Sequence, residues 1–166
     1  EVAHAWLEIL KQRKPAGLLL SRQNLPVFDR EDVASAENVS KGAYILKEAA
    51  GNITAIVIAT GSEVAIALKA QAELAQEDIH IRVVSAPCLE WFEAQDIKYR
   101  EEVLPPNIKL RVSIEAGVSQ PWHKYLGFEG SAISLEHFGA SASAQVLYEK
   151  FGITSDQVSN RIKSLM

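Results

Sequence analysis

The sequence predicts an α/β protein in which a parallel sheet lies between two layers of helices. After residue 43, short apolar runs alternate along the chain with stretches whose apolar residues have helical spacing. The run Ile53–Ala59 is almost wholly apolar and β-branched, as expected for a central parallel strand that is buried on both faces. Apolar residues make up 48% of the 166 residues, which is enough to form a core. These observations favour a three-layer α/β/α sandwich.

The first forty residues have a different pattern. Residues 1–13 have the apolar spacing of a helix with one buried face, and Lys14 and Pro15 end it. Residues 16–20 are mostly apolar and are predicted to form a buried strand. Residues 27–40 are polar and charged, so we interpret them as a linker between two domains.

The remaining elements follow from apolar runs and from capping signals. Thr154 with Gln157 predicts the start of a terminal helix, and Gly152 predicts the end of the helix before it. The predicted strands are Tyr44–Leu46, Ile53–Ala59, Ile79–Ser85, Leu110–Glu115 and Ala132–Leu135. Helices are predicted after Thr60–Glu63, in two short pieces over Leu89–Val103, at Trp122–Leu126, over Ala144–Phe151 and after Thr154.

Charge and cysteine content argue against several classes of protein. The 17 basic and 21 acidic residues give a formal net charge of −4, whereas a nucleic-acid surface needs a basic stripe. No apolar run approaches the length of a membrane-spanning helix, and the first residues lack the pattern of a secretory signal. Cys88 is the only cysteine, so no disulfide framework is expected. A cytoplasmic location fits these features.

Arg22 is the strongest candidate for a binding residue. It follows the predicted strand at residues 16–20, and Asn24 and Pro26 then turn the chain. Open α/β sheets bind ligands beyond the carboxyl ends of their strands. A guanidinium offers a rigid fork of donors that suits phosphate or carboxylate. On spacing alone, an ion pair between Arg22 and a surface Asp or Glu is the favoured alternative.

Two turns can be interpreted either as an anion-binding site or as a simple helix cap. The segment Thr60-Gly61-Ser62-Glu63 joins a buried strand to a helix, where free backbone N–H groups can hold an anion. A helix N-cap with a glycine turn is favoured, because the spacing matches neither glycine-rich nucleotide fingerprint. Phe138-Gly139-Ala140-Ser141 presents the same choice, with Ser141 as the cap of the next helix.

Other polar residues are interpreted as structural. Glu115 ends a strand, where catalytic groups often lie, but no paired acid or nucleophile is near it in the sequence. We therefore expect Glu115 to anchor a neighbouring loop or subunit. Cys88 is interpreted as a packing residue, and Trp122 and Tyr125 as core edge or subunit interface. The histidines are too scattered for a metal motif: His4, His80, His123 and His137.

The order of several short motifs resembles transketolase, the thiamine-diphosphate enzyme of the pentose phosphate pathway. The most specific motif is Ser21-Arg22-Gln23-Asn24-Leu25-Pro26. Each motif alone is weak, but their order and spacing together are specific and cover essentially the whole chain. The other matches are Lys41-Gly42-Ala43-Tyr44-Ile45-Leu46, Ala59-Thr60-Gly61-Ser62-Glu63-Val64, Arg82-Val83-Val84-Ser85, Tyr99-Arg100-Glu101, Glu115-Ala116-Gly117, His123-Lys124-Tyr125 and Phe138-Gly139-Ala140-Ser141.

The resemblance places the chain at the end of a transketolase subunit. Such a subunit has a diphosphate-binding domain, a pyrimidine-binding domain and a C-terminal domain with a five-stranded mixed sheet that has one antiparallel strand. Residues 1–26 would be the end of the pyrimidine-binding domain, 27–40 the linker, and 41–166 the C-terminal domain. Because the chain begins with Glu1, not Met, inside a predicted helix, we expect it to be a fragment.

The resemblance also implies an activity for the parent enzyme. That enzyme would transfer a two-carbon ketol unit from a ketose phosphate to an aldose phosphate, using thiamine diphosphate and Mg²⁺ or another divalent cation. By resemblance it would be a homodimer, and Arg22 would bind the substrate phosphate. The catalytic residues, including the glutamate that activates the cofactor pyrimidine, and the cofactor and metal ligands would all lie outside this chain. The fragment alone is therefore expected to be inactive.

Two alternatives stay open. Dihydroxyacetone synthase, deoxyxylulose-phosphate synthase and a 2-oxoacid dehydrogenase subunit share the domain order. The Ser21–Pro26 motif favours transketolase, or the closely similar dihydroxyacetone synthase, over the others. The second alternative is a non-catalytic module for dimer contact or effector binding, with Thr60–Glu63 or Gly139–Ser141 as the ligand site.

Overall fold

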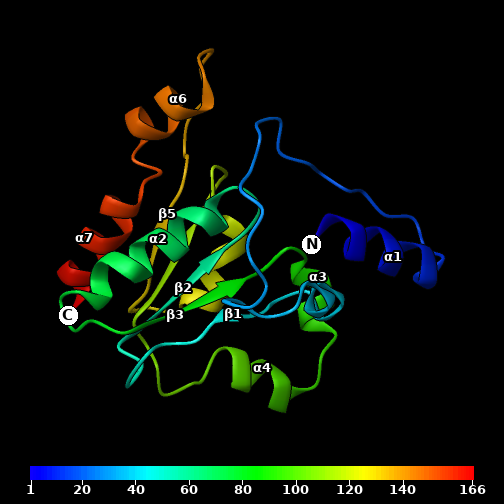
Figure 1. Ribbon diagram of the computed structural model, residues 1–166, viewed down its shortest axis with the longest axis horizontal. Coiled ribbons are helices and arrows are strands. Elements are labelled where there is room, and N and C mark those ends of the chain that lie inside the picture. The colour runs from blue at the N-terminus through cyan, green and yellow to red at the C-terminus, as the bar shows by residue number, and fades with distance from the viewer.

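A five-stranded mixed sheet forms the centre of the molecule in the computed structural model, which describes all 166 residues (Figure 1). The strand order is β1-β3-β2-β4-β5, with β1 antiparallel to β3 and the other neighbouring pairs parallel. The predicted sheet with one antiparallel strand is confirmed, and each strand lies within two residues of its predicted bounds. The strands are β1 (Tyr44–Lys47), β2 (Ala55–Ala59), β3 (Ile81–Ser85), β4 (Arg111–Ile114) and β5 (Ser131–Ile133).

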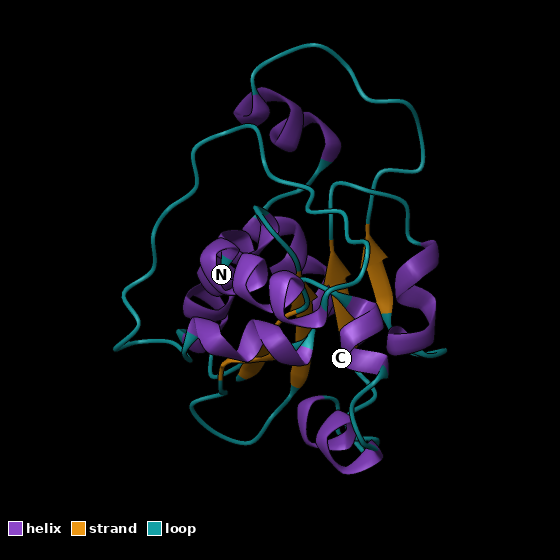
Figure 2. Ribbon diagram, turned by 90° about the vertical axis from the view of Figure 1, so that its right-hand side faces the viewer, coloured by secondary structure: helices purple, strands orange, loops and turns teal.

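Helices cover both faces of the sheet, which confirms the three-layer sandwich (Figure 2). Helices α2 and α7 pack on one face, whereas α3, α4 and α5 pack on the other. The α-helices are α1 (Val2–Gln12), α2 (Glu63–Ala75), α3 (Leu89–Glu93), α4 (Ile97–Val103), α5 (His123–Leu126), α6 (Ala144–Phe151) and α7 (Ser155–Leu165). Two short 3₁₀ helices, η1 (Ala36–Lys41) and η2 (Gln120–Trp122), complete the structure.

Strand β2 supplies both cores. All five of its residues are buried, and successive side chains of a strand point to opposite faces of the sheet. Val57 lies in the core with α2 and α7, whereas Ile56 and Ile58 lie in the core with α3, α4 and α5. Burial of such a side chain stabilises the fold by about 1.5–3 kcal/mol. The apolar run in the sequence therefore corresponds to burial on both faces, as predicted.

The predicted strand at residues 16–20 is wrong. These residues have no regular structure, and none of the five strands pairs with them. Leu19 is 92% exposed and Leu20 is 60% exposed. A strand needs the hydrogen bonds of a neighbouring strand, and all the pairing in this chain is made among β1 to β5. An apolar run in a sequence favours burial, but it does not show whether a neighbouring strand is present to pair with it.

The predicted linker contains a short helix that its polar composition did not indicate. Residues 27–35 have no regular helix or strand, but η1 follows directly. The Ser35 side chain caps η1 by accepting a hydrogen bond from the Glu37 backbone N–H. Val39 of η1 is buried in the same core as α2 and α7. The second half of this segment is thus part of the packed domain.

Helix α1 rests against the domain without burying any of its residues. It lies beside η1, and its largest apolar side chains, Trp6 and Leu10, are exposed. Its firmest attachment is at its start, where a Glu1 carboxylate oxygen accepts hydrogen bonds from the Tyr44 hydroxyl (2.5 Å) and the Ser85 hydroxyl (2.7 Å). The predicted apolar face of the helix is therefore present, but no other element of the chain covers it.

Arg82 joins three elements at the start of β3. Its guanidinium donates to both carboxylate oxygens of Glu48, at 2.9 and 2.7 Å, and to the backbone carbonyls of Glu102 and Val103. The two carbonyls lie at the end of α4, where a cation is favoured by the helix dipole. Although burial opposes the effect, Arg82 holds the pKa of the Glu48 carboxyl below its ordinary value.

We expect α1 to exchange its amide hydrogens much faster than β2. A helix of this length is marginal in water without packing, whereas β2 is buried and paired on both sides. Hydrogen exchange followed by mass spectrometry checks this. Equal protection of the two segments would show that α1 is held as firmly as the central strand.

Replacing Glu48 by Gln removes its ion pair with Arg82 and is expected to lower the free energy of unfolding at neutral pH. The expected loss is only about 1 kcal/mol, because the Glu48 side chain is half-exposed and solvent screens the pair. The lowered pKa means that the carboxylate contributes its full stability above its ordinary pKa of 4.5 and loses it as the pH falls further. The difference between the two proteins should therefore shrink toward about pH 3 in urea unfolding. Glu101→Gln, at an exposed residue of α4, is the control and should show no such trend.

Candidate functional site

Arg22 lies on the exposed loop between α1 and η1. Its guanidinium belongs to none of the ion pairs or side-chain hydrogen bonds of the chain. The alternative, an ion pair between Arg22 and a surface Asp or Glu, is therefore absent from the structure. Its donors are free to bind a ligand.

Arg22 faces α6 across a cavity of about 620 Å³. Arg22 and Gln23 line one side, and the other side consists of residues 140–144 with Leu147 and Tyr148. The structure thus brings Arg22 together with Ser141 of the second candidate turn. Ser141 does not cap α6, however, because Ser143 is the N-cap residue and its side chain makes no capping bond. The prediction that Ser141 is the cap is wrong by two residues.

The carbonyls of the turn at Thr60–Ser62 accept hydrogen bonds from the first backbone N–H groups of α2. Gly61 has a positive φ of 54°, and the N–H groups of Glu63 and Val64 donate to the carbonyls of Thr60 and Gly61. The prediction that this turn is a plain N-cap is only partly right. The Ser62 hydroxyl makes no capping bond and instead contacts the Glu63 carboxylate and the Tyr148 hydroxyl.

Glu63 is a buried carboxyl at the start of α2, with 4% of its surface exposed. The Tyr148 hydroxyl donates to its Oε1 at 2.5 Å, and the Ser62 hydroxyl donates to the same atom at 3.2 Å. Burial raises the pKa of Glu63, and these hydrogen bonds offset only part of that effect. Burial and the neighbouring Glu63 also raise the pKa of Tyr148. Because a carboxyl already occupies this helix N-terminus, the geometry favours the glycine turn over an anion site.

Glu115 fits the predicted role of an anchor. Its Oε2 accepts a hydrogen bond from the indole N–H of Trp122 at 2.7 Å, which fixes η2 against the end of β4. Trp122 is buried in the core with α3, α4 and α5. The aromatic cluster around His123 is therefore core edge, as predicted.

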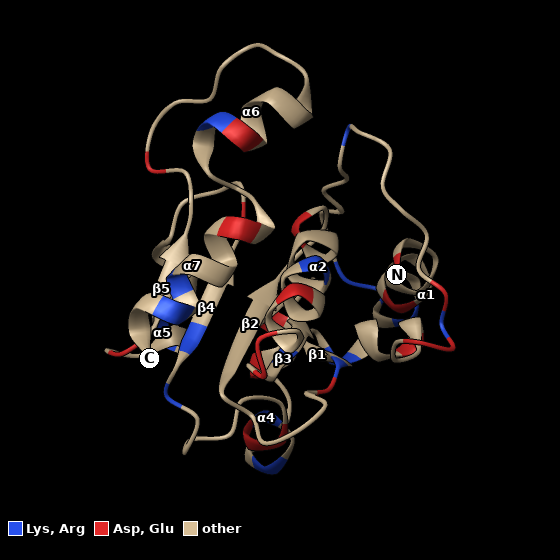
Figure 3. Ribbon diagram, turned by 60° about the vertical axis from the view of Figure 1, so that its left-hand side comes forward, with Lys and Arg blue, Asp and Glu red and all other residues tan.

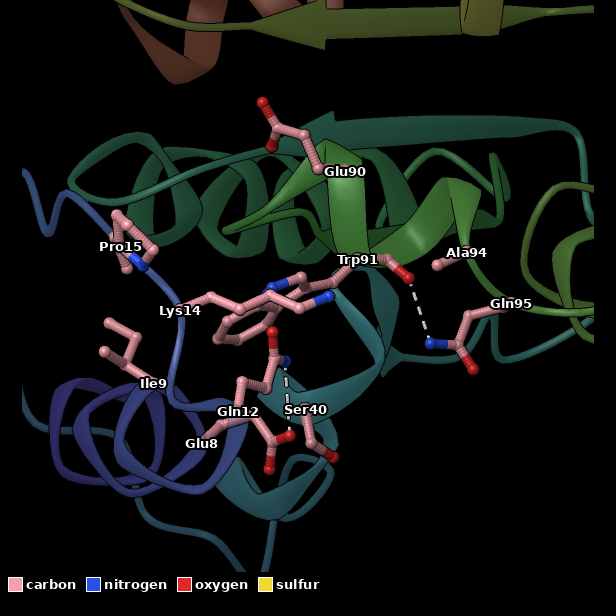
Figure 4. Close-up of a pocket in the computed structure, with 11 residues that line it drawn as sticks. Glu8, Ile9, Gln12, Lys14, Pro15, Ser40, Glu90, Trp91, Ala94 and Gln95 are labelled. Carbon is pink, nitrogen blue, oxygen red and sulfur yellow. Dashed lines mark hydrogen bonds between the residues drawn. The ribbon is translucent and has the colours of Figure 1, made fainter.

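Two further cavities lie along the first nineteen residues. One, of about 520 Å³, separates α1 from α3, and Figure 4 shows Trp91 pointing from α3 toward α1 across it. The other, of about 620 Å³, lies between the loop at residues 15–19 and the carboxyl ends of β2, β3 and β4. Cys88, which is half-buried, lines this second cavity, and burial raises the pKa of its thiol.

The His, Cys, Asp and Glu side chains of the chain form no metal site. No three His, Cys, Asp or Glu side chains gather in a way that could hold a metal ion, so the residues of this chain do not fit the divalent cation that the resemblance implies. Both basic and acidic residues occur on the helices and loops, and several of the basic ones lie near β4, β5 and α7 (Figure 3). None of the helices is long and apolar enough to cross a membrane.

Comparison with known proteins gives one family. The family described as "Transketolase-like TK C-terminal domain" matches residues 42–154. The chain is 48% identical to the transketolase of Mycobacterium tuberculosis over 95% of this chain and 23% of that protein. It is also 48% identical to the transketolase of Rhodobacter capsulatus, over 100% of this chain and 25% of that protein. The chain thus spans about a quarter of the length of these relatives.

A solved structure shows the same relationship in three dimensions. The transketolase of Pichia stipitis in complex with sedoheptulose-7-phosphate superposes with a TM-score of 0.77 and 33% sequence identity. The match covers 87% of this chain and 20% of that chain.

Proposed function

The chain belongs to the transketolase family, and on this premise we propose that it is the C-terminal part of a transketolase. The full enzyme would transfer a two-carbon ketol unit from a ketose phosphate to an aldose phosphate in the pentose phosphate pathway. The relatives named transketolase, at 48% identity over nearly the whole chain, support this proposal.

The observation that carries the proposal for this chain is the free guanidinium of Arg22 beside a cavity. A guanidinium without a protein partner can give two parallel N–H donors to phosphate oxygens. Its place in the Ser21–Pro26 motif and the sugar phosphate bound by the Pichia stipitis relative support the same assignment. Arg22 would hold the phosphate end of the sugar and so orient the reacting end, which lies elsewhere in the enzyme.

The rest of the active site would come from outside this chain. Thiamine diphosphate supplies the carbanion chemistry in this family, with a divalent cation on its diphosphate. We assign no ligand of either group to this chain, and we take residues 1–26 as the end of the pyrimidine-binding domain. The exposed face of α1 and the exposed leucines at residues 19 and 20 would then pack against the remainder of that domain. We also expect a cytoplasmic homodimer.

Two other functions compete with this proposal. Dihydroxyacetone synthase and deoxyxylulose-phosphate synthase have the same domain order, but the relatives compared above carry the name transketolase. A non-catalytic module for dimer contact or effector binding would need a ligand at Thr60–Glu63 or Gly139–Ser141. The buried Glu63 carboxyl makes the first of these turns unsuitable for an anion.

Replacing Arg22 by Ala in the full-length enzyme is expected to lower kcat/KM for phosphorylated sugars while leaving cofactor binding intact. A charged hydrogen bond of this kind contributes roughly 1.5–3 kcal/mol, which corresponds to about a 10- to 150-fold loss. Arg22→Lys should recover only part of the activity, since an ammonium keeps the charge but not the fork. A coupled assay with xylulose 5-phosphate and ribose 5-phosphate measures the effect.

The control is the same assay with the unphosphorylated form of the donor sugar, which should be affected far less. An equal loss with both donors would mean that Arg22 supports structure or chemistry and does not recognise phosphate. Absence of activity of the unmodified enzyme with these two sugars would refute the transketolase assignment itself.

The 166-residue chain alone is expected to be inactive and not to bind thiamine diphosphate with Mg²⁺. No set of side chains in it gathers to hold the cation. Isothermal titration calorimetry of the chain with the cofactor and Mg²⁺ checks this, with the full-length enzyme as the positive control. Saturable micromolar binding to the chain would contradict the prediction.

A further inference from the structure

Gln23 makes the side-chain hydrogen bond that ties the Arg22 loop to the rest of the molecule. From residue 19 to residue 27, every residue except Gln23 is exposed to solvent. The Gln23 side-chain amide donates a hydrogen bond of 3.4 Å to the Tyr148 hydroxyl. The neighbouring Ser21 lies over Gly61, because its hydroxyl oxygen is 3.7 Å from the place that a β-carbon of Gly61 would take. Arg22 thus lies between two residues, Ser21 and Gln23, that contact the rest of the molecule.

Tyr148 is itself held by two other residues. Its hydroxyl donates to the buried Glu63 carboxylate at 2.5 Å and lies 2.9 Å from the Ser62 hydroxyl. Because the single proton of the tyrosine goes to Glu63, its oxygen lone pairs remain available to the Gln23 amide. Glu63 is nearly fully buried at the first turn of α2, so this arrangement fixes the hydroxyl relative to the sheet.

The contact joins three parts of the chain that are far apart in sequence. The loop that carries Arg22, the first turn of α2 and the helix α6 meet at the Tyr148 hydroxyl. Tyr148 also lines the cavity that Arg22 faces. A flexible loop binds a ligand more weakly, because binding must then order it. An anchor next to Arg22 therefore has a direct effect on the affinity for the group that Arg22 binds.

We propose that Tyr148, held by Glu63 and Ser62, is a positioning residue that fixes the Arg22 loop through Gln23 and thereby strengthens recognition of the sugar phosphate. This inference rests on the proposed function of Arg22 and extends it to the C-terminal domain. The domain contributes to substrate affinity through one tyrosine hydroxyl, without a side chain that touches the reacting atoms.

The test is Tyr148→Phe in the full-length enzyme, which removes the hydroxyl and keeps the ring. The loss of the neutral hydrogen bond between Gln23 and Tyr148 predicts about a two- to tenfold rise in KM for xylulose 5-phosphate, with kcat nearly unchanged. KM for the unphosphorylated donor should stay the same. Tyr125→Phe is the matched control, because the Tyr125 hydroxyl also donates to a carboxylate, that of Glu93 at 2.7 Å, away from the Arg22 loop. It should leave KM for both donors unchanged.

Gln23→Ala provides a second test that does not threaten the fold, because Gln23 lies on a surface loop. It should raise KM for the phosphorylated donor to a similar extent. The double variant Gln23→Ala with Tyr148→Phe should be no worse than the poorer single variant, because both changes remove the same hydrogen bond. Additive effects, or a Tyr148→Phe enzyme that behaves like Tyr125→Phe, would overturn the inference.

Measuring Arg22→Ala in parallel separates the two proposals. If Arg22→Ala loses activity only with phosphorylated sugars and Tyr148→Phe changes nothing, the positioning role fails and the phosphate assignment stands. If Arg22→Ala weakens both donors equally, the phosphate assignment fails and the inference about Tyr148 falls with it.

Discussion

Strand β2 is buried on both faces and paired with a strand on each side, and the rest of the structure depends on this arrangement. Its backbone pairs with β3 on one side and β4 on the other, and its side chains fill both cores. Since all three strands run parallel, their carboxyl ends meet at one edge of the sheet, and each connection must return through a crossover on a face. The turns after these strands therefore gather at that edge. The loop that carries Arg22 and the helix α6 reach these carboxyl ends, because Ser21 lies near Gly61 and the Tyr148 hydroxyl contacts Ser62.

Basic side chains lie at the amino ends of the parallel strands, and acidic side chains lie at their carboxyl ends. At the amino ends of the strands, Arg82 and Arg111 donate to backbone carbonyls of the segments around α4 and α5. At the carboxyl ends, Glu63 and Glu115 accept from Tyr148 and Trp122. At the amino ends the pattern follows the backbone, because helix C-termini present free carbonyls, whereas at the carboxyl ends the partners are side chains. Arg82 and Glu63 are buried, and each is satisfied by hydrogen bonds at its end of the strands.

The elements that could be predicted from the sequence are those whose signal is local. The apolar run of β2 and the capping pair Thr154 and Gln157 identify their elements without reference to any other part of the chain. The run at residues 16–20 has an equally clear local pattern, but whether it becomes a strand depends on a neighbour. The helix η1 was missed because Val39 is its only large apolar residue, and the burial of Val39 depends on the core beneath it.

The candidate site could be predicted only in part for the same reason. Arg22 was found from its motif, but the contact of Gln23 with Tyr148 joins residues 125 positions apart, which no local pattern reveals. The sequence does contain one signal for this contact. Glu63 follows a buried strand and its turn, and a carboxyl that is buried at such a place requires a hydrogen-bond partner.

The loop that carries Arg22 depends on contacts outside itself for a fixed position. No residue of the segment before η1 is buried, yet the proposed recognition of a phosphate by the Arg22 guanidinium would require a fixed geometry. The rigidity must therefore come from outside that segment, and within this chain the bonded contact available to the exposed residues around Arg22 is the Tyr148 hydroxyl. That hydroxyl in turn depends on a carboxyl buried at the end of β2. The same buried strand that determines the fold thus also supplies the fixed point from which the exposed loop is held.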